Sequence, residues 1–153
     1  MQSSKAFTLI ELIFVIVILG ILSSIALPHF AKTKELADIA KGRSDVASIR
    51  SAIVTDRQAH IIKGDSAYIS ALCSGTGTGA GIKIFDTNGT SDRKLLTYGI
   101  VTSLADGKWS KNGTSCIKFN FKVNSVDIVF DYNSTDGSFT CDRTDTTCKK
   151  MVD

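Results

Sequence analysis

The sequence is poor in the residues from which acid–base catalytic sites are built. It contains only two histidines, His29 and His60. A single histidine on a helix is typical of a packed or edge residue, and no pair of carboxylates has a setting typical of proton transfer. We therefore expect no enzymatic activity.

Motifs for zinc and for nucleotides are also missing. The four cysteines include no C-x-x-C pair, the spacing that many structural zinc sites use. The glycine-rich stretch Ser74–Gly81 lacks the Gly-Lys-Ser/Thr ending of a phosphate-binding loop and is typical of a flexible connection. The net charge is +3 with both signs interspersed, which by itself indicates no nucleic-acid or other charged partner.

Basic residues are absent between Lys5 and Lys32, and most of this interval is apolar. As a helix, the run Phe7–Leu27 would be roughly 30 Å long, about the thickness of a bilayer core. An ordinary secretory signal has a shorter apolar region with a small-residue cleavage site after it. Here Pro28 follows and no Ala-x-Ala pattern is present, so we predict a membrane-spanning helix.

One acidic residue, Glu11, interrupts the apolar run. A charge at membrane depth costs about 2.5–3.5 kcal/mol on insertion scales unless a partner neutralises it. If the chain is cut before Phe7, the new α-amino group lies one helical turn from Glu11, in the same chain or beside a neighbouring copy. The alternative is an ordinary signal anchor in which Glu11 is tolerated.

The sequence around this carboxylate resembles a known signal. Lys5-Ala6 followed by Phe7-Thr8-Leu9-Ile10-Glu11-Leu12 is similar to the cleavage and methylation signal of type IV pilins and of the pseudopilins of type II secretion and DNA-uptake systems. The resemblance implies cleavage between Ala6 and Phe7 by a prepilin peptidase and N-methylation of Phe7. It also implies that Glu11 aligns each subunit with the amine of the next. Ala6 departs from the family, which usually has glycine before the cut.

Gly20 and Pro28 fall where family members carry helix-weakening residues. Glycine is about 1 kcal/mol less favourable than alanine inside a helix, and proline removes a hydrogen bond and clashes with the preceding turn. The resemblance implies that the segment between them can lose helical structure on assembly.

The resemblance further implies an organisation and a location. We expect a leader at residues 1–6, a transmembrane and filament-core helix at residues 7–30, and a periplasmic α+β head at residues 31–153. The expected function is that of a structural subunit, assembled through its N-terminal helix into a type II secretion pseudopilus or a type IV pilus. Its expected partners are other pilin subunits in a homo- or hetero-polymer, the prepilin peptidase, the inner membrane and its assembly platform.

Beyond Pro28 the apolar residues become periodic, which predicts that the helix continues to about Lys63. The predicted buried stripe consists of Leu36, Ile39, Val46, Ile49, Ile53 and either His60 or Ile61. Lys41 and Asp45 are four residues apart, a spacing typical of a solvated face. Gly42 is tolerated there at a small energetic cost.

The last part of the chain alternates with a period of two, which predicts strands. The clearest strands are Ile117–Val123 and Val126–Tyr132, with shorter ones at Lys83–Phe85 and Leu95–Thr102. A two-residue connection makes the first two a hairpin. The predicted cross-strand pairs are Phe121 with Ile128, Phe119 with Phe130, Lys118 with Asp131 and Lys122 with Asp127. Their apolar face would receive the helix stripe and give an α+β head with a small antiparallel sheet.

All four cysteines follow the apolar run, and an even number in an oxidising compartment favours disulfides. We favour Cys141 with Cys148, which leaves Cys73 to reach Cys116. The alternative is that one or more are free buried thiols.

Two loop motifs are candidate surface sites. The segment Asp86–Asp92 is rich in oxygen donors, which suit calcium, although a plain turn of Asp, Asn and Gly explains it as well. We expect no other metal or cofactor. Asn88 and Asn133 both lie in D-x-N-x-T patterns, which resemble the acceptor signal of some bacterial oligosaccharyltransferases. The sequon at Asn112 lacks the acidic residue.

An alternative function is that of a minor tip pilin whose head binds DNA or a secreted substrate. Lys108, Trp109 and Lys111 are close in the sequence, and an aromatic ring between cations can stack on a base. A solvated loop with an anchored tryptophan explains the same cluster without any nucleic acid.

Overall fold

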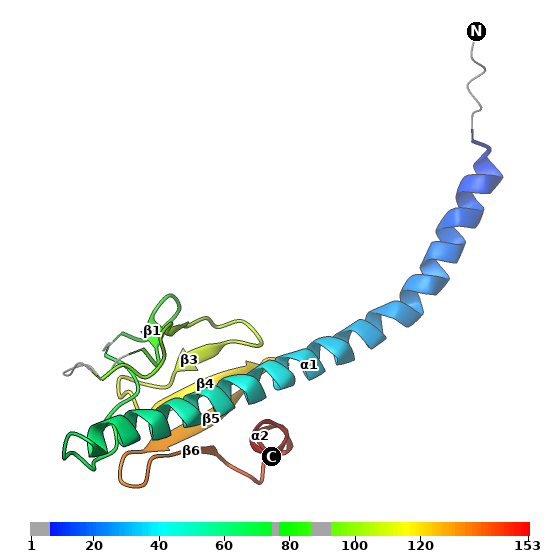
Figure 1. The fold of residues 1–153 in the computed structure, drawn as a ribbon. Coiled ribbons are helices and arrows are strands. Elements are labelled where there is room, and N and C mark those ends of the chain that lie inside the picture. Colours follow the sequence, from blue (N-terminus) through cyan, green and yellow to red (C-terminus); the bar gives the residue numbers. More distant parts are fainter. Residues whose placement is uncertain (1–6, 75–76, 87–92) are drawn as a thin grey trace. The chain divides into compact units, whose positions relative to one another are not determined.

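The structure is a computed structural model that describes residues 7–74, 77–86 and 93–153 (Figure 1). Its first element is α1, Leu9–Ile61, a helix of 53 residues. The predicted continuation beyond Pro28 is confirmed, and the helix ends two residues before the predicted limit. A turn follows in which Gly64 has a φ of +88°, a conformation that favours glycine.

The chain divides into two units, residues 1–36 and 37–153. The described part of the first unit is the front of α1 with the two residues before it. The second unit contains the rest of α1 and all other helices and strands, and we refer to it as the head.

The head contains a four-stranded antiparallel sheet in the order β3-β4-β5-β6. The strands are β3 Trp109–Lys111, β4 Lys118–Val123, β5 Val126–Asn133 and β6 Ser138–Cys141. The predicted hairpin is confirmed in its register, with Phe121 opposite Ile128 and Phe119 opposite Phe130. Asn124 and Ser125 both have positive φ, as the two-residue turn between twisted strands requires. The predicted α+β class is therefore the observed one.

The segments before this sheet are less regular than predicted. The strands described there are β1 Lys83–Ile84 and β2 Ile100–Val101, which pair as a separate two-stranded ladder. Phe85 leaves its predicted strand because its φ is +58°, which is incompatible with an extended chain. Its amide instead donates to the Leu72 carbonyl at 2.7 Å. Of the predicted strand Leu95–Thr102, only Ile100–Val101 is regular, although the Leu95 and Leu96 amides donate to the Asp86 and Phe85 carbonyls, each at 3.0 Å.

The core lies between α1 and the inner face of the sheet, where the helix crosses β4 and β5 (Figure 1). Four residues of the predicted stripe are buried there: Ile39, Val46, Ile49 and Ile53. The prediction is wrong at Leu36, which is exposed. Of the two alternatives at the other end, His60 is half-buried and Ile61 is exposed. Opposite the stripe is an aromatic cluster of Phe85, Trp109, Phe119, Phe121, Phe130 and Phe139. Its rings form stacked, tilted and edge-on pairs, the arrangements that aromatic rings favour.

Two disulfides, Cys73–Cys116 and Cys141–Cys148, pair all four cysteines as the sequence favoured. The second one ties the end of β6 to a short C-terminal helix, α2 Thr146–Val152, which periodicity did not predict. The Asp145 carboxylate caps α2 by accepting the backbone N–H groups of residues 147 and 148, each at 2.8 Å.

Candidate functional site

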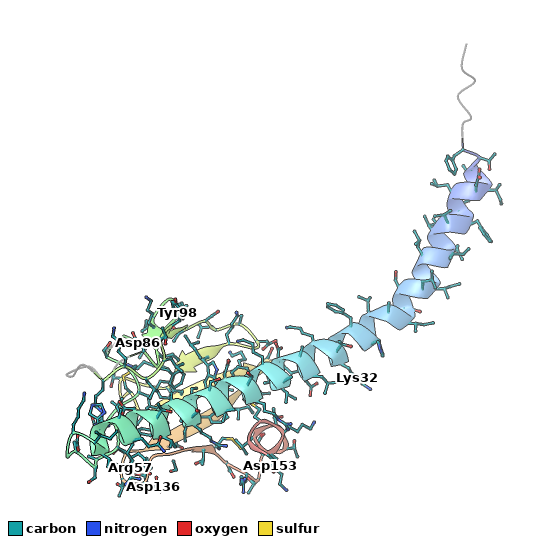
Figure 2. The ribbon with its side chains drawn as sticks, in the orientation of Figure 1. Lys32, Arg57, Asp86, Tyr98, Asp136 and Asp153 are labelled. Atoms are coloured by element: carbon teal, nitrogen blue, oxygen red, sulfur yellow. A yellow bond between two sulfur atoms is a disulfide. The ribbon has the colours of Figure 1, made fainter. Side chains whose placement is uncertain are left out.

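The front of α1 presents apolar side chains on all of its faces (Figure 2). Within residues 7–27 every residue is exposed, and the large apolar side chains range from 39% exposed at Ile18 to 79% at Phe7. Of the helices in the described residues, α1 alone is long and apolar enough to cross a membrane. An apolar surface of this size has to be covered by lipid or by other helices.

Glu11 lies in the first turn of α1 and contacts Thr8, the residue directly before the helix. One of its carboxylate oxygens is 3.4 Å from both the backbone nitrogen and the hydroxyl of Thr8. In return, the Glu11 N–H donates to the Thr8 hydroxyl at 3.4 Å. This reciprocal arrangement is a capping box, in which both side chains satisfy free N–H groups of the helix end.

The spacing Thr8-x-x-Glu11 ahead of an apolar run is the sequence signature of a capping box. Hydrophobicity and periodicity alone did not indicate it. It holds the carboxylate at the end of the helix that carries the positive pole of the helix dipole. The oxygen therefore lies beside the backbone nitrogen that directly follows Phe7. Ala6 lies outside the described residues, so the predicted cleavage between Ala6 and Phe7 stays a prediction, as do methylation of Phe7 and alignment by Glu11.

Gly20 and Pro28 both lie within α1, which is helical through both positions. A Cβ atom on Gly20 would have no neighbour within 4 Å, so no packing contact explains the glycine in this chain. The loss of helix that the resemblance implies on assembly remains a prediction.

The Lys108, Trp109 and Lys111 cluster does not form a base-stacking surface. Trp109 is fully buried in strand β3, and its ring centroid is 5.0 Å from that of Phe121. Lys111 is also buried, which lowers the pKa of its amine, and its Nζ donates to the Thr114 carbonyl at 3.0 Å. Only Lys108 is exposed. The hypothesis of stacking by Trp109 is wrong, because its indole is fully buried in the core and no face of the ring is open to a base.

The calcium hypothesis falls mostly outside the described residues, since only Asp86 of the segment Asp86–Asp92 belongs to them. The Asp86 Oδ1 atom is buried and has no hydrogen-bond partner in the described part of the chain. Among those residues no three or more His, Cys, Asp or Glu side chains form a group that could hold a metal. Calcium binding stays a prediction, and Asn88 also lies outside the described residues.

An ionic cluster that the sequence analysis missed joins α1 to the segment after residue 92. The Arg93 guanidinium donates to the Asp56 carboxylate at 2.6 and 3.0 Å, and both side chains are largely buried. Arg93 also reaches Asp65 at 3.3 Å. The Nδ1 atom of His60 is 2.8 Å from the Asp56 carbonyl, so this histidine lies at the edge of the cluster. Asp56, His60 and Arg93 line one part of a groove of about 750 Å³, whose other walls are small residues of α1 and residues 94–95.

Three arginines of α1 that are seven residues apart form a second set of missed contacts. Each donates through Nε to a backbone carbonyl of another segment: Arg43 to Lys150 at 2.9 Å, Arg50 to Phe139 at 3.0 Å and Arg57 to Ser66 at 3.2 Å. The spacing places them on one side of the helix. They attach α1 to α2, to β6 and to the chain that follows α1.

Known proteins match this chain either over about a third of its length or over most of it. Residues 1–27 match the family described as the prokaryotic N-terminal methylation motif. The type II secretion system core protein G of Klebsiella michiganensis is 44% identical over 52 residues, which are 34% of this chain and 37% of that protein. The corresponding protein of Pectobacterium carotovorum is 47% identical over 49 residues, 32% of this chain and 31% of that protein.

A longer match is the type IV major alpha-pilin of Moraxella bovis, 28% identical over 142 residues, which are 92% of this chain and 86% of that pilin. The match to the secretion proteins spans only about a third of their length. No solved structure matches the chain significantly. The chain thus carries the prokaryotic N-terminal methylation motif and is similar in sequence to type II secretion core proteins G and to a type IV major pilin.

Proposed function

We propose that this protein is a structural subunit of a filament. A prepilin peptidase cleaves it before Phe7, the new N-terminus is methylated, and the subunit assembles through the front of α1. The observation that carries the proposal is the all-round exposure of the apolar side chains in residues 7–27, together with a carboxylate in the first helical turn. Lipid covers this surface before assembly, and the helices of other subunits cover it afterwards.

The proposed topology has one membrane span at residues 7–30, with the leader at residues 1–6 on the cytoplasmic side. The head, residues 31–153, then lies in the periplasm and later in a periplasmic or surface filament. Two disulfides support this placement, because such bonds persist in oxidising compartments. The inner-membrane assembly platform is the proposed partner that takes the subunit out of the membrane.

The proposed role of Glu11 follows from its position in the capping box. Thr8 keeps the carboxylate beside the end of the helix, so the amine of a neighbouring Phe7 meets an oriented acceptor. A subunit that is out of register leaves the carboxylate unpaired in an apolar environment, which costs about 2.5–3.5 kcal/mol. The penalty selects one axial alignment, as buried polar groups do in other helix assemblies.

The proposed filament is either a type II secretion pseudopilus or a type IV pilus. The matches to secretion core protein G support the first, and the longer match to a major pilin supports the second. We propose no catalytic activity for the chain. The alternative, a minor tip subunit that binds DNA or a secreted substrate, receives no support from the buried Trp109.

The test compares Glu11→Val with Glu35→Gln, which changes the other glutamate of the chain outside the apolar run. In the native host we expect both variants to reach the membrane and to begin with methylated Phe7. Only Glu11→Val should lose filaments, measured by sedimentation and electron microscopy of sheared fractions. Normal filaments from Glu11→Val would refute the role of Glu11. A working protein that retains Met1 through Ala6 would refute the whole proposal.

A further inference from the structure

The end of the β5–β6 hairpin carries one of the two D-x-N-x-T motifs, and the structure describes all of its residues. Asn133 is the last residue of β5, and Ser134, Thr135 and Asp136 form the turn to β6. All four are exposed, and Asp136 marks the turn in Figure 2. The sequon is therefore on the surface, where an asparagine has to lie if an enzyme is to modify it.

The side chain of Asn133 is oriented by the turn that follows it. Its Oδ1 accepts the Thr135 backbone N–H at 2.9 Å, and its backbone carbonyl accepts the N–H of Gly137 at 2.8 Å. In the described part of the chain the amide nitrogen, Nδ2, donates no hydrogen bond. The carbonyl side of the amide is thus engaged with the turn, and the nitrogen, which is the atom that glycosylation modifies, is left to solvent.

The acidic residue of the motif is also accessible. Asp131 lies two residues before Asn133, on the same outer face of β5. Its side chain is 56% exposed and forms an ion pair with Lys118, itself exposed, at 3.1 Å. An exposed pair of this kind contributes about 0–1 kcal/mol and is readily exchanged for another partner. Asp131 can therefore leave Lys118 for a cationic group of an enzyme.

The hairpin end is held mainly by contacts within residues 133–138. Residues 133–138 are joined by the ladder pair of Asn133 with Ser138, by the two bonds to Asn133 and by a bond from the Ser138 N–H to Asp136 at 2.8 Å. The Tyr68 ring lies close to Gly137. Directly before them, Tyr132 is buried and its hydroxyl donates to the Ile69 carbonyl at 2.6 Å. Tyr132 thus anchors the chain directly before Asn133, and the exposed acceptor lies at the hairpin end.

The chain contains a natural comparison. Asn112 begins the sequon Asn112-Gly113-Thr114, but the residue two positions before it is Ser110, which is neutral and buried in β3. Asn112 is only partly exposed. It shares the minimal sequon with Asn133, but it lacks the acidic residue and is less exposed.

We propose that Asn133 is a glycosylation site, modified by an oligosaccharyltransferase that uses a lipid-linked pyrophosphate sugar donor. In the reaction, Nδ2 attacks the anomeric carbon of the first sugar and a C–N bond forms. The bond from that carbon to the pyrophosphate oxygen breaks, the lipid pyrophosphate leaves, and the amide proton passes to a base of the transferase. The proposal rests on the periplasmic placement of the head in the proposed function, since the transferase acts on that side of the membrane.

Trypsin separates the three sequons, which makes the test direct. Cleavage after lysine and arginine places Asn88 in residues 84–93, Asn112 in residues 112–118 and Asn133 in residues 123–143. We purify the full chain from membranes of its native host, reduce and alkylate it, and measure the masses of these peptides. The peptide 123–143 should carry a glycan on Asn133, and the peptide 112–118 should carry none.

Three variants examine the recognition of the site. Asn133→Gln and Asp131→Asn should each abolish the modification of peptide 123–143, whereas Asn112→Gln should leave it unchanged. A wild-type peptide 123–143 found only at its unmodified mass would overturn the proposal, as would full modification of Asp131→Asn. Sequencing the N-terminus of the same sample tells the two hypotheses apart. An N-terminus at Phe7 with unmodified Asn133 refutes glycosylation alone, whereas retention of Met1 refutes the proposed function.

Discussion

The indole nitrogen of Trp109 donates a hydrogen bond to a carboxylate oxygen of Asp45 at 2.9 Å, which joins β3 to α1. The spacing of Lys41 and Asp45 predicted a solvated pair, and the Lys41 Nζ atom does lie 3.7 Å from the Asp45 Oδ2 atom. Asp45 nevertheless also faces inward, because the only polar atom of a fully buried indole needs an acceptor. This contact is specific to the head and can be tested by changing the acceptor alone.

Asp45→Ala should lower the free energy of unfolding of the head by about 1–3 kcal/mol, because the buried indole N–H loses its acceptor. Asp45→Asn is the matched control, since its amide oxygen can still accept the bond, and it should be destabilised less. Urea titration of the detergent-solubilised chain, followed by the fluorescence of its single tryptophan, measures both. Equal losses in the two variants would show that the carboxylate charge, and not the acceptor, stabilises this contact.

Gly42→Ala should destabilise the head by about 1–3 kcal/mol, the usual effect of overpacking. Helix propensity alone predicts the opposite, a gain of about 1 kcal/mol. A Cβ atom at this position would contact the Met151 methyl group and lie 2.8 Å from the Phe121 ring. The methionine can move aside, but the ring is packed against Trp109. Gly20→Ala, where a Cβ has open space, should leave the urea midpoint of the head unchanged.

The two disulfides should contribute unequally to stability. They close loops with sequence separations of 43 and 7 residues. In the chain-entropy estimate, removing Cys73–Cys116 costs about 4 kcal/mol and removing Cys141–Cys148 about 2 kcal/mol. Paired cysteine-to-serine variants, compared by thermal unfolding, measure the difference. A larger loss from the Cys141–Cys148 variant would mean that attachment of α2 matters more than loop closure.

Tyr132 should make the head sensitive to alkaline pH. Burial raises the pKa of its phenol from 10.0 to about 12 in the folded chain. Its stabilising contribution is therefore fully present below pH 10 and is lost as the pH rises toward 12, because the unfolded chain ionises first. Tyr132→Phe should be less stable at neutral pH by about 1 kcal/mol, through loss of the bond to Ile69. The difference between the two urea midpoints should shrink above pH 10, and a constant difference would contradict the assignment.

Arg50→Met should destabilise the head by about 1–3 kcal/mol, because the Phe139 carbonyl of β6 loses its donor while the aliphatic stem is retained. Arg143→Met is the control. Arg143 pairs with Asp153 in an exposed position, where an ion pair contributes about 0–1 kcal/mol. Thermal unfolding of both variants measures the contrast, and equal effects would show that the contact of Arg50 with β6 contributes no more than a surface pair.

Local patterns predicted the features that depend on neighbours along the chain. The hairpin register followed from alternation on both sides of Asn124 and Ser125, because a two-residue turn leaves one way to pair the strands. The continuation of α1 beyond Pro28 followed from apolar periodicity. The predicted ends of the strands were less accurate. The strand at Lys83 ends before Phe85 because that residue has a positive φ, which an alternation pattern does not reveal.

The sequence by itself determined the apolar front of α1, the single carboxylate in that front at Glu11 and the inward faces of β4 and β5, since all of these follow from residue type and spacing. Three contacts were decided by the tertiary structure alone. The Trp109 indole donates to Asp45, Arg93 pairs with Asp56, and the Phe121 ring packs where a Cβ on residue 42 would lie. These pairs are between 37 and 79 residues apart in the chain. Contacts at such separations depend on how helix and sheet pack together, and periodicity within one segment carries no information about its partner in another.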